Sequence, residues 1–117
     1  MLMVIGALAG LVGVALSAAA AHGPGGPNLE TASRYLLFHA PVLLAIVALA
    51  RMGAIHAGTG RIAGWLIVIG LILFCGDLAM RALRNAALFP MAAPTGGFVL
   101  MGGWAVLAVA ALLRLIR

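Results

Sequence analysis

Four long runs of apolar residues, separated by short polar or glycine-rich segments, dominate the chain. Each run is about as long as the roughly 20 residues that an α-helix needs to cross the hydrocarbon core of a bilayer. The pattern predicts four membrane-spanning helices, over residues 2–21, 29–51, 61–84 and 97–115. Because the connections are short, we expect an antiparallel four-helix bundle of up-down-up-down topology, a single all-α integral membrane domain over residues 1–117.

Proline and glycine mark where the predicted spans are separated. The first connection, residues 22–27, holds two prolines and three glycines, which do not continue a helix. Residues 52–60 form the second connection, and Pro94, Gly96 and Gly97 are predicted to turn the chain in the last one. The first run lacks the basic start of a signal peptide and exceeds its usual apolar length, so we expect a membrane span there.

The composition supports a membrane environment. Of the 117 residues, 66% are apolar and only 8% are charged, whereas about a quarter of the residues of a soluble domain are charged. Intrinsic disorder is excluded as well, because disordered chains are rich in charge and poor in apolar residues. The lipid bilayer is therefore the expected surrounding of the chain.

Arginine is the source of the net charge of +5, because the chain contains no lysine. The arginines fall at the ends of apolar runs, as expected for anchors at lipid headgroups, and nucleic acid is not an expected partner. Four arginines lie on the side of both termini and three on the other side. If acidic neighbours hold Arg34 and Arg81, the bias puts both termini in the cytoplasm.

Small residues on the first span indicate a close contact between helices. Gly6, Gly10, Gly13 and Ser17 follow one another at spacings of three and four residues. Such a stripe lets the backbones of two membrane helices approach each other. We therefore interpret it as a surface on which another helix packs.

The polar side chains gather at one end of the predicted bundle, near the first and last connections. This candidate cluster consists of His22, Glu30, Arg34, Tyr35, His39, Asp77 and Arg81. Asp77 is expected about 10 Å inside the end of its span, with Arg81 one turn away as the partner that an intramembrane carboxylate needs. Glu30 and Arg34 have the same spacing. His39 lies at a depth similar to that of Asp77, so we expect it to face the third span near Asp77.

Three interpretations of this cluster are open. It could be a polar clamp that fixes the register of the helices, a proton-carrying or ligand-binding pair, or a metal or haem site. No spacing motif such as His-x-x-x-His supports the metal or haem site, so no metal and no cofactor are predicted. Cys75 is the only cysteine of the chain, which excludes an intrachain disulfide.

Five short motifs carry a family resemblance. They are residues 20–23 (Ala-Ala-His-Gly), 33–40 (Ser-Arg-Tyr-Leu-Leu-Phe-His-Ala), 73–78 (Leu-Phe-Cys-Gly-Asp-Leu), 89–97 (Phe-Pro-Met-Ala-Ala-Pro-Thr-Gly-Gly) and 102–104 (Gly-Gly-Trp). In order and spacing the chain resembles the YgdD-like small bacterial membrane proteins, domain-of-unknown-function family number 423. The resemblance implies a four-span inner-membrane protein without an established activity.

The resemblance also implies which polar positions recur in the family. They correspond here to His22, Arg34, Tyr35, His39, Gly76 and the turn at residues 94–97. It further implies a serine in many relatives where this chain has Asp77. That difference weakens any mechanism that requires a carboxylate at this position.

The function best supported by these observations is that of a non-catalytic structural or accessory membrane subunit, acting as a homo-oligomer or within a larger membrane protein complex. The alternative is a small transporter or channel component that uses the polar cluster. Its weakness is that residues 42–50 and 62–73 offer almost no polar lining for a path across the membrane. An enzyme is not predicted, because neither a nucleophile with an adjacent base nor a pair of carboxylates is recognisable.

Overall fold

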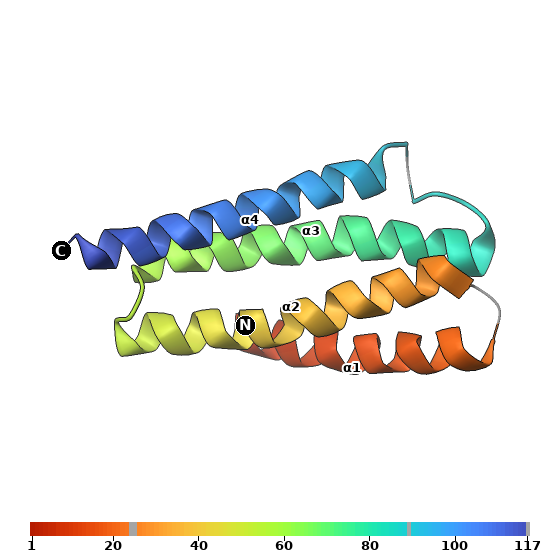
Figure 1. Ribbon diagram of the computed structural model, residues 1–117, viewed down its shortest axis with the longest axis horizontal. Helices are drawn as coiled ribbons and strands as arrows, with labels where there is room; N and C mark the ends of the chain where they lie inside the picture. The colour runs from red at the N-terminus through yellow and green to blue at the C-terminus, as the bar shows by residue number, and fades with distance from the viewer. Residues whose placement is uncertain (24–25, 89, 117) are drawn as a thin grey trace.

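Over the residues that the structure describes, the architecture consists of four α-helices. The computed structural model describes residues 1–23, 26–88 and 90–116, and its helices are α1 (Leu2–His22), α2 (Gly26–Met52), α3 (Ala57–Arg84) and α4 (Ala92–Leu115). Each helix is long and apolar enough to cross a membrane. Successive helices run in opposite directions (Figure 1). The protein is an all-α integral membrane protein with up-down-up-down topology, which confirms the predicted fold class.

Three of the helices begin before the predicted spans. α2, α3 and α4 start at Gly26, Ala57 and Ala92, where the hydrophobic pattern predicts residues 29, 61 and 97. The reason at α2 and α4 is proline, which we interpreted as a helix breaker. Within the first turn a proline is tolerated, because its missing N–H would have no partner inside the helix.

The predicted turn at Pro94, Gly96 and Gly97 is therefore wrong. All three residues lie in the first two turns of α4. The chain reverses before them, between Asn85 and Met91, which both have left-handed backbone conformations with φ values of 54° and 68°. Non-glycine residues adopt this region mainly in turns and at helix ends, and that is the role of both residues here.

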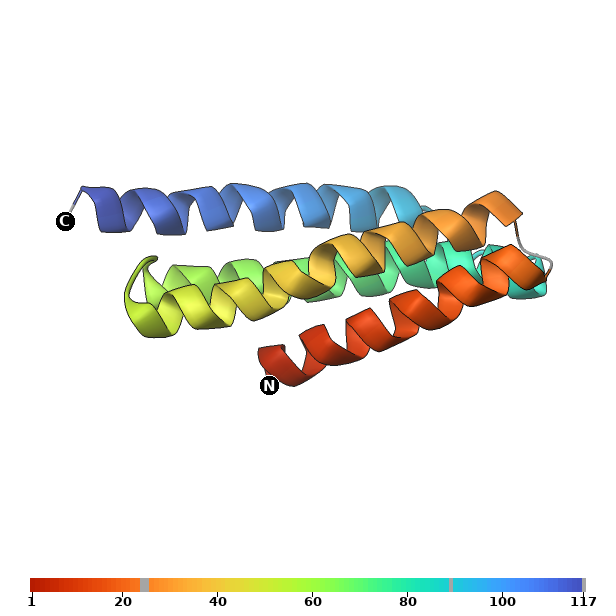
Figure 2. The same cartoon turned by 60° about the horizontal axis from the view of Figure 1, so that its bottom comes forward.

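The helices form an open arrangement in chain order. α1 packs on α2, α2 on α3 and α3 on α4, whereas α1 and α4 make no close backbone approach over the described residues. Figure 2 shows α1 and α4 on opposite sides of the α2 and α3 pair. Many large apolar side chains of all four helices are exposed. These faces are suited to contact with lipid, because hydrocarbon is as apolar as the side chains themselves.

Glycine brings the backbones of α3 and α4 into close contact. A Cβ atom added to Gly96 would lie 2.5 Å from the backbone nitrogen of Phe74 and 2.9 Å from the backbone oxygen of Gly70. Further along the same interface, a Cβ on Gly103 would lie 2.7 Å from a side-chain carbon of Ile67. Only glycine allows this approach, since real Cβ atoms do not come so near backbone atoms.

The small-residue stripe of α1 lies against α2. A Cβ on Gly6 would meet Leu43 at 3.1 Å, and one on Gly10 would meet Ala40 at 3.6 Å. Gly13 is buried, and its carbonyl oxygen accepts a 2.8 Å hydrogen bond from the hydroxyl of Ser33. Ser17, the last member of the stripe, is exposed.

Candidate functional site

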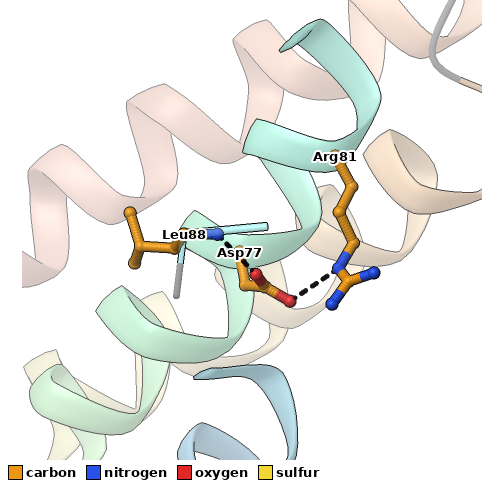
Figure 3. A network of polar contacts seen from close by, with 3 residues as sticks. All are labelled: Asp77, Arg81 and Leu88. Atoms are coloured by element: carbon orange, nitrogen blue, oxygen red, sulfur yellow. Dashed lines mark hydrogen bonds and ion pairs between the residues drawn. The ribbon is translucent and has the colours of Figure 1, made fainter. Parts of the chain in front are cut away.

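Asp77 is fully buried and belongs to a small polar network at one end of α3. Its Oδ2 accepts a 2.9 Å hydrogen bond from Nε of Arg81, one helical turn further on. Its Oδ1 accepts a 2.8 Å hydrogen bond from the backbone N–H of Leu88 in the connection to α4. Figure 3 shows the carboxylate between these two donors. The carboxylate therefore fastens the connecting segment to α3.

The position of this network explains how the membrane tolerates the charge. Asp77 precedes the end of α3 at Arg84 by about 10 Å along the helix axis. The side chain of Arg81 is 47% exposed, whereas that of Asp77 is 0% exposed. Arg81 thus extends from the buried carboxylate towards the surface, as long cationic side chains do near the ends of spans.

His39 connects α2 to α4. Its Nδ1 lies 2.8 Å from the backbone oxygen of Tyr35, and its Nε2 lies 3.1 Å from Nε1 of Trp104. A backbone oxygen only accepts and an indole nitrogen only donates. Nδ1 therefore carries the proton of a neutral imidazole, and Nε2 accepts the hydrogen bond from Trp104. This contact joins two helices whose backbones do not approach closely.

The prediction that His39 faces the third span near Asp77 is wrong about the residue to which the His39 side chain bonds. The hydrogen-bonding side-chain partner of His39 is Trp104 of α4, while both oxygens of Asp77 bond to Arg81 and Leu88. Trp104 is not among the polar residues that the sequence pattern predicts for the cluster. The available signal was its indole N–H, which needs an acceptor when a tryptophan lies within an apolar span.

A lateral groove lies between α2 and α4, with α3 as its floor. We call it the α2/α4 groove; its volume is about 420 Å³, and its lining residues are Arg34, Tyr35, Phe38, His39, Phe74, Gly97, Leu100, Met101 and Trp104. Aromatic rings dominate its walls, and the rings of Tyr35 and Phe74 are 4.5 Å apart between centroids. The groove exists because α2 and α4 are joined by side chains rather than by close backbone contact.

The remaining members of the predicted cluster lie apart from the buried network. Glu30 and Arg34 form an ion pair of 2.6 Å on the surface of α2, with side chains 57% and 75% exposed. His22 is exposed at the end of α1. Of the seven predicted residues, Asp77 pairs with Arg81, Glu30 pairs with Arg34, and His22 lies by itself. The structure brings three of them together in the α2/α4 groove: Arg34, Tyr35 and His39.

The buried polar groups satisfy one another rather than face an empty site. In the part of the chain that the structure describes, every buried side-chain nitrogen or oxygen atom has a hydrogen-bond partner. Over the same residues no three His, Cys, Asp or Glu side chains lie close enough together to hold a metal ion. Cys75 is buried, and its Sγ contacts the backbone oxygen of Ala32 at 3.5 Å. The arrangement is suited to joining helices.

Comparison with known proteins places the chain among small membrane proteins. Residues 16–97 match the model of the family described as protein of unknown function (DUF423). The chain is 31% identical to the UPF0382 membrane protein SERP0230 of Staphylococcus epidermidis, covering 94% of this chain and 93% of that protein. It is 30% identical to the UPF0382 membrane protein YwdK of Bacillus subtilis, over 93% of this chain and 94% of that protein. No solved structure matches the chain. The chain belongs to this family of membrane proteins of unknown function.

Proposed function

We propose that the protein is a non-catalytic accessory subunit of the bacterial inner membrane, which receives an apolar transmembrane helix of a larger membrane protein in its α2/α4 groove. The observation that carries this proposal is the internal pairing of the buried polar groups. Asp77 and His39 are the two titratable side chains best placed for chemistry. The polar atoms of both side chains form hydrogen bonds with other groups of this chain. Their role is to hold helices and connections in place.

The open arrangement of the helices supports a lateral partner. A closed four-helix bundle surrounds its core on all sides, whereas here the side between α2 and α4 is left open above Phe74. The groove lies between α2 and α4, which run in the same direction (Figure 1), and nearly all of its lining is apolar or aromatic. Another transmembrane helix could pack there by van der Waals contact, which is a main source of helix association in lipid.

The distribution of arginine supports an orientation with both termini in the cytoplasm. On the side of the first and last connections, Arg34 and Arg81 are held by acidic side chains. On the other side, Arg51, Arg61 and Arg114 belong to helices whose described residues place no carboxylate beside them. Free cationic charge near span ends favours the cytoplasmic side.

The test is extraction of the protein from native membranes in polymer-bounded lipid discs, followed by mass spectrometry of the captured complexes. Gly97 lines the groove, and a Cβ added there meets nothing within 4 Å. Gly97→Leu should therefore fill the groove without disturbing the helices. Gly102 on the same helix is equally open but does not line the groove, so Gly102→Leu is the matched control.

We expect the wild type and Gly102→Leu to carry one larger membrane protein in a fixed ratio, and Gly97→Leu to lose it. A lone monomer in the wild type contradicts the proposal. Recovery of a second copy of this chain, lost on Gly97→Leu, would show that the groove serves self-association instead.

The alternative function, a small transporter or channel component, makes a separate prediction. It requires His39 and Asp77 to act on a passing ion or solute, although both are already bonded within the chain. Flux of protons or ions into proteoliposomes that is abolished by His39→Ala and Asp77→Ala would favour this alternative over an accessory subunit. We expect no such flux from the wild type.

A further inference from the structure

A second hollow lies at the end of the molecule opposite Asp77. Figure 1 shows that the ends of α2 and α3 extend beyond the start of α1, which leaves a step where α1 does not cover them. The hollow in this step has a volume of about 310 Å³, and its walls include Leu2, Ile46, Val47, Arg51, Arg61 and Trp65. We call it the arginine hollow. It is separate from the α2/α4 groove and does not depend on the function proposed above.

Two arginines from different helices line the same small volume. Arg51 lies in the last turn of α2, and Arg61 lies near the start of α3. The chain has only two acidic side chains, and both are bonded to other arginines, Arg34 and Arg81. The stretch of α3 from Arg61 to Arg81 is about 30 Å long. No acidic side chain of this chain therefore neutralises the arginine hollow.

The lower part of the arginine hollow is apolar. Trp65 lies one turn below Arg61 on α3, and Ile46 and Val47 lie one turn or more below Arg51 on α2. Tryptophan favours the boundary between headgroups and hydrocarbon. The hollow thus presents two cations at headgroup depth and an apolar wall beneath them, the order of polarity that a phospholipid has along its length.

We propose that the arginine hollow binds an anionic phospholipid, with its phosphate between Arg51 and Arg61 and an acyl chain along Ile46, Val47 and Trp65. Guanidinium groups bind phosphate oxygens through paired, charge-assisted hydrogen bonds. A free inorganic phosphate shares this headgroup chemistry, but it leaves the apolar wall without a partner. Two arginines with no acidic side chain of this chain beside them favour a lipid of net negative charge over a zwitterionic one.

Trp65 gives a direct reporter of the bound lipid. The chain has two tryptophans, Trp65 and Trp104, and Trp65 is 39% exposed. The experiment measures quenching of tryptophan fluorescence by lipids with brominated acyl chains, in vesicles that mix phosphatidylglycerol and phosphatidylcholine. One series carries bromine on the anionic lipid and the other on the zwitterionic lipid. A Trp65→Phe variant supplies the contribution of Trp104, which is subtracted.

We expect the anionic brominated lipid to quench Trp65 more strongly at equal mole fraction. Its association constant relative to that of phosphatidylcholine should be several-fold above one. Arg51→Gln combined with Arg61→Gln should bring that constant to about one. The control is Arg114→Gln, because Arg114 lies beside Gly53 and is not part of the hollow; it should keep the wild-type preference. Arg51→Lys with Arg61→Lys should retain part of it. Circular dichroism checks that every variant keeps its helices.

Equal quenching by both lipids in the wild type would overturn the proposal. So would an equal loss of preference in Arg114→Gln, which would indicate a diffuse effect of net charge. Inorganic phosphate at millimolar concentration should leave the quenching unchanged. If it abolishes the anionic preference, the site binds a free anion and the lipid assignment is wrong.

Discussion

At the scale of single residues, the buried polar side chains act between segments of the chain. Ser33 bonds α2 to α1, His39 accepts from α4, and Asp77 holds the connection that follows α3. In hydrocarbon a polar group without a partner is costly, because no water replaces the missing hydrogen bond. Each of these side chains therefore specifies one arrangement of its neighbours.

Asp77 gives the first prediction. Asp77→Ala removes the acceptor of both Arg81 and the Leu88 N–H. We expect a loss of about 1–3 kcal/mol in the free energy of unfolding, since a backbone donor is left unpaired. Asp77→Asn keeps an oxygen acceptor and should lose less. Denaturation of both variants in mild detergent measures the difference; equal stability of Asp77→Ala and wild type would contradict the role assigned to the carboxylate.

His39 gives a second prediction, concerning the position of its proton. In nitrogen NMR spectra, the imidazole of His39 should show a protonated Nδ1 and an unprotonated Nε2, because its partners are the Tyr35 oxygen and the Trp104 N–H. Trp104→Phe removes the donor and should shift Nε2 alone, leaving His22 and His56 as unchanged references. A proton on Nε2 in the wild type would rule out the bond to Trp104.

At the scale of the helix, two neighbouring positions of α4 show how glycine controls the contact between α4 and α3. Gly96 and Gly97 are neighbours, but a Cβ on Gly96 would meet backbone atoms of α3, whereas one on Gly97 would meet open space. The two positions therefore form a matched pair for testing the α3 and α4 interface.

Gly96→Ala should destabilise the protein by about 1–3 kcal/mol or more, because the added methyl forces the two backbones apart. Gly97→Ala should be neutral or stabilising by up to about 1 kcal/mol, since alanine favours the helix over glycine. Thermal unfolding in the same detergent compares them. Similar melting temperatures for the two variants would show that the close approach of α3 and α4 is not present.

The sequence was sufficient for features that depend on local spacing. Apolar runs of span length predict four helices, and the one-turn spacing of Asp77 and Arg81, or of Glu30 and Arg34, is enough to suggest the pairs that the structure contains. The contact of His39 with Trp104 could not be predicted in this way. It joins residues 65 positions apart in the chain, and it depends on which faces of α2 and α4 meet.

The prediction of where α4 begins was wrong for a related reason. Proline and glycine in residues 94–97 have two meanings: they end helices in loops, and they are accepted in a first turn or at a close helix contact. Only the position of α3 decides between these meanings, because Gly96 lies directly on the backbone of Phe74. A single sequence does not contain that position.

At the scale of the whole molecule, the helices form an open row rather than a closed bundle. α1 and α4 lie on opposite sides of the α2 and α3 pair (Figure 2), and the molecule measures 50 × 26 × 19 Å. Its length is comparable to the thickness of a bilayer with its headgroups, about 40–45 Å. The α2/α4 groove and the arginine hollow both result from incomplete cover by a neighbouring helix.

The proposed orientation gives a prediction at this scale. Arg34 and Arg81 are paired with carboxylates, so the cationic bias of the other end should hold both termini in the cytoplasm. A green fluorescent protein fused after the C-terminus should fluoresce, and alkaline phosphatase fused at the same place should be inactive. The opposite pattern would reverse the orientation.

The most direct test of the accessory role is photocrosslinking in growing cells from the rim of the α2/α4 groove. Met101 lines the groove and is 64% exposed, whereas Val109 on the same helix is 46% exposed and lies outside it. With a benzophenone amino acid at each position in turn, we predict a crosslink from position 101 to one larger membrane protein, absent from position 109 and lost in Gly97→Leu. Crosslinks to lipid alone at position 101, or the same products from both positions, would contradict the account.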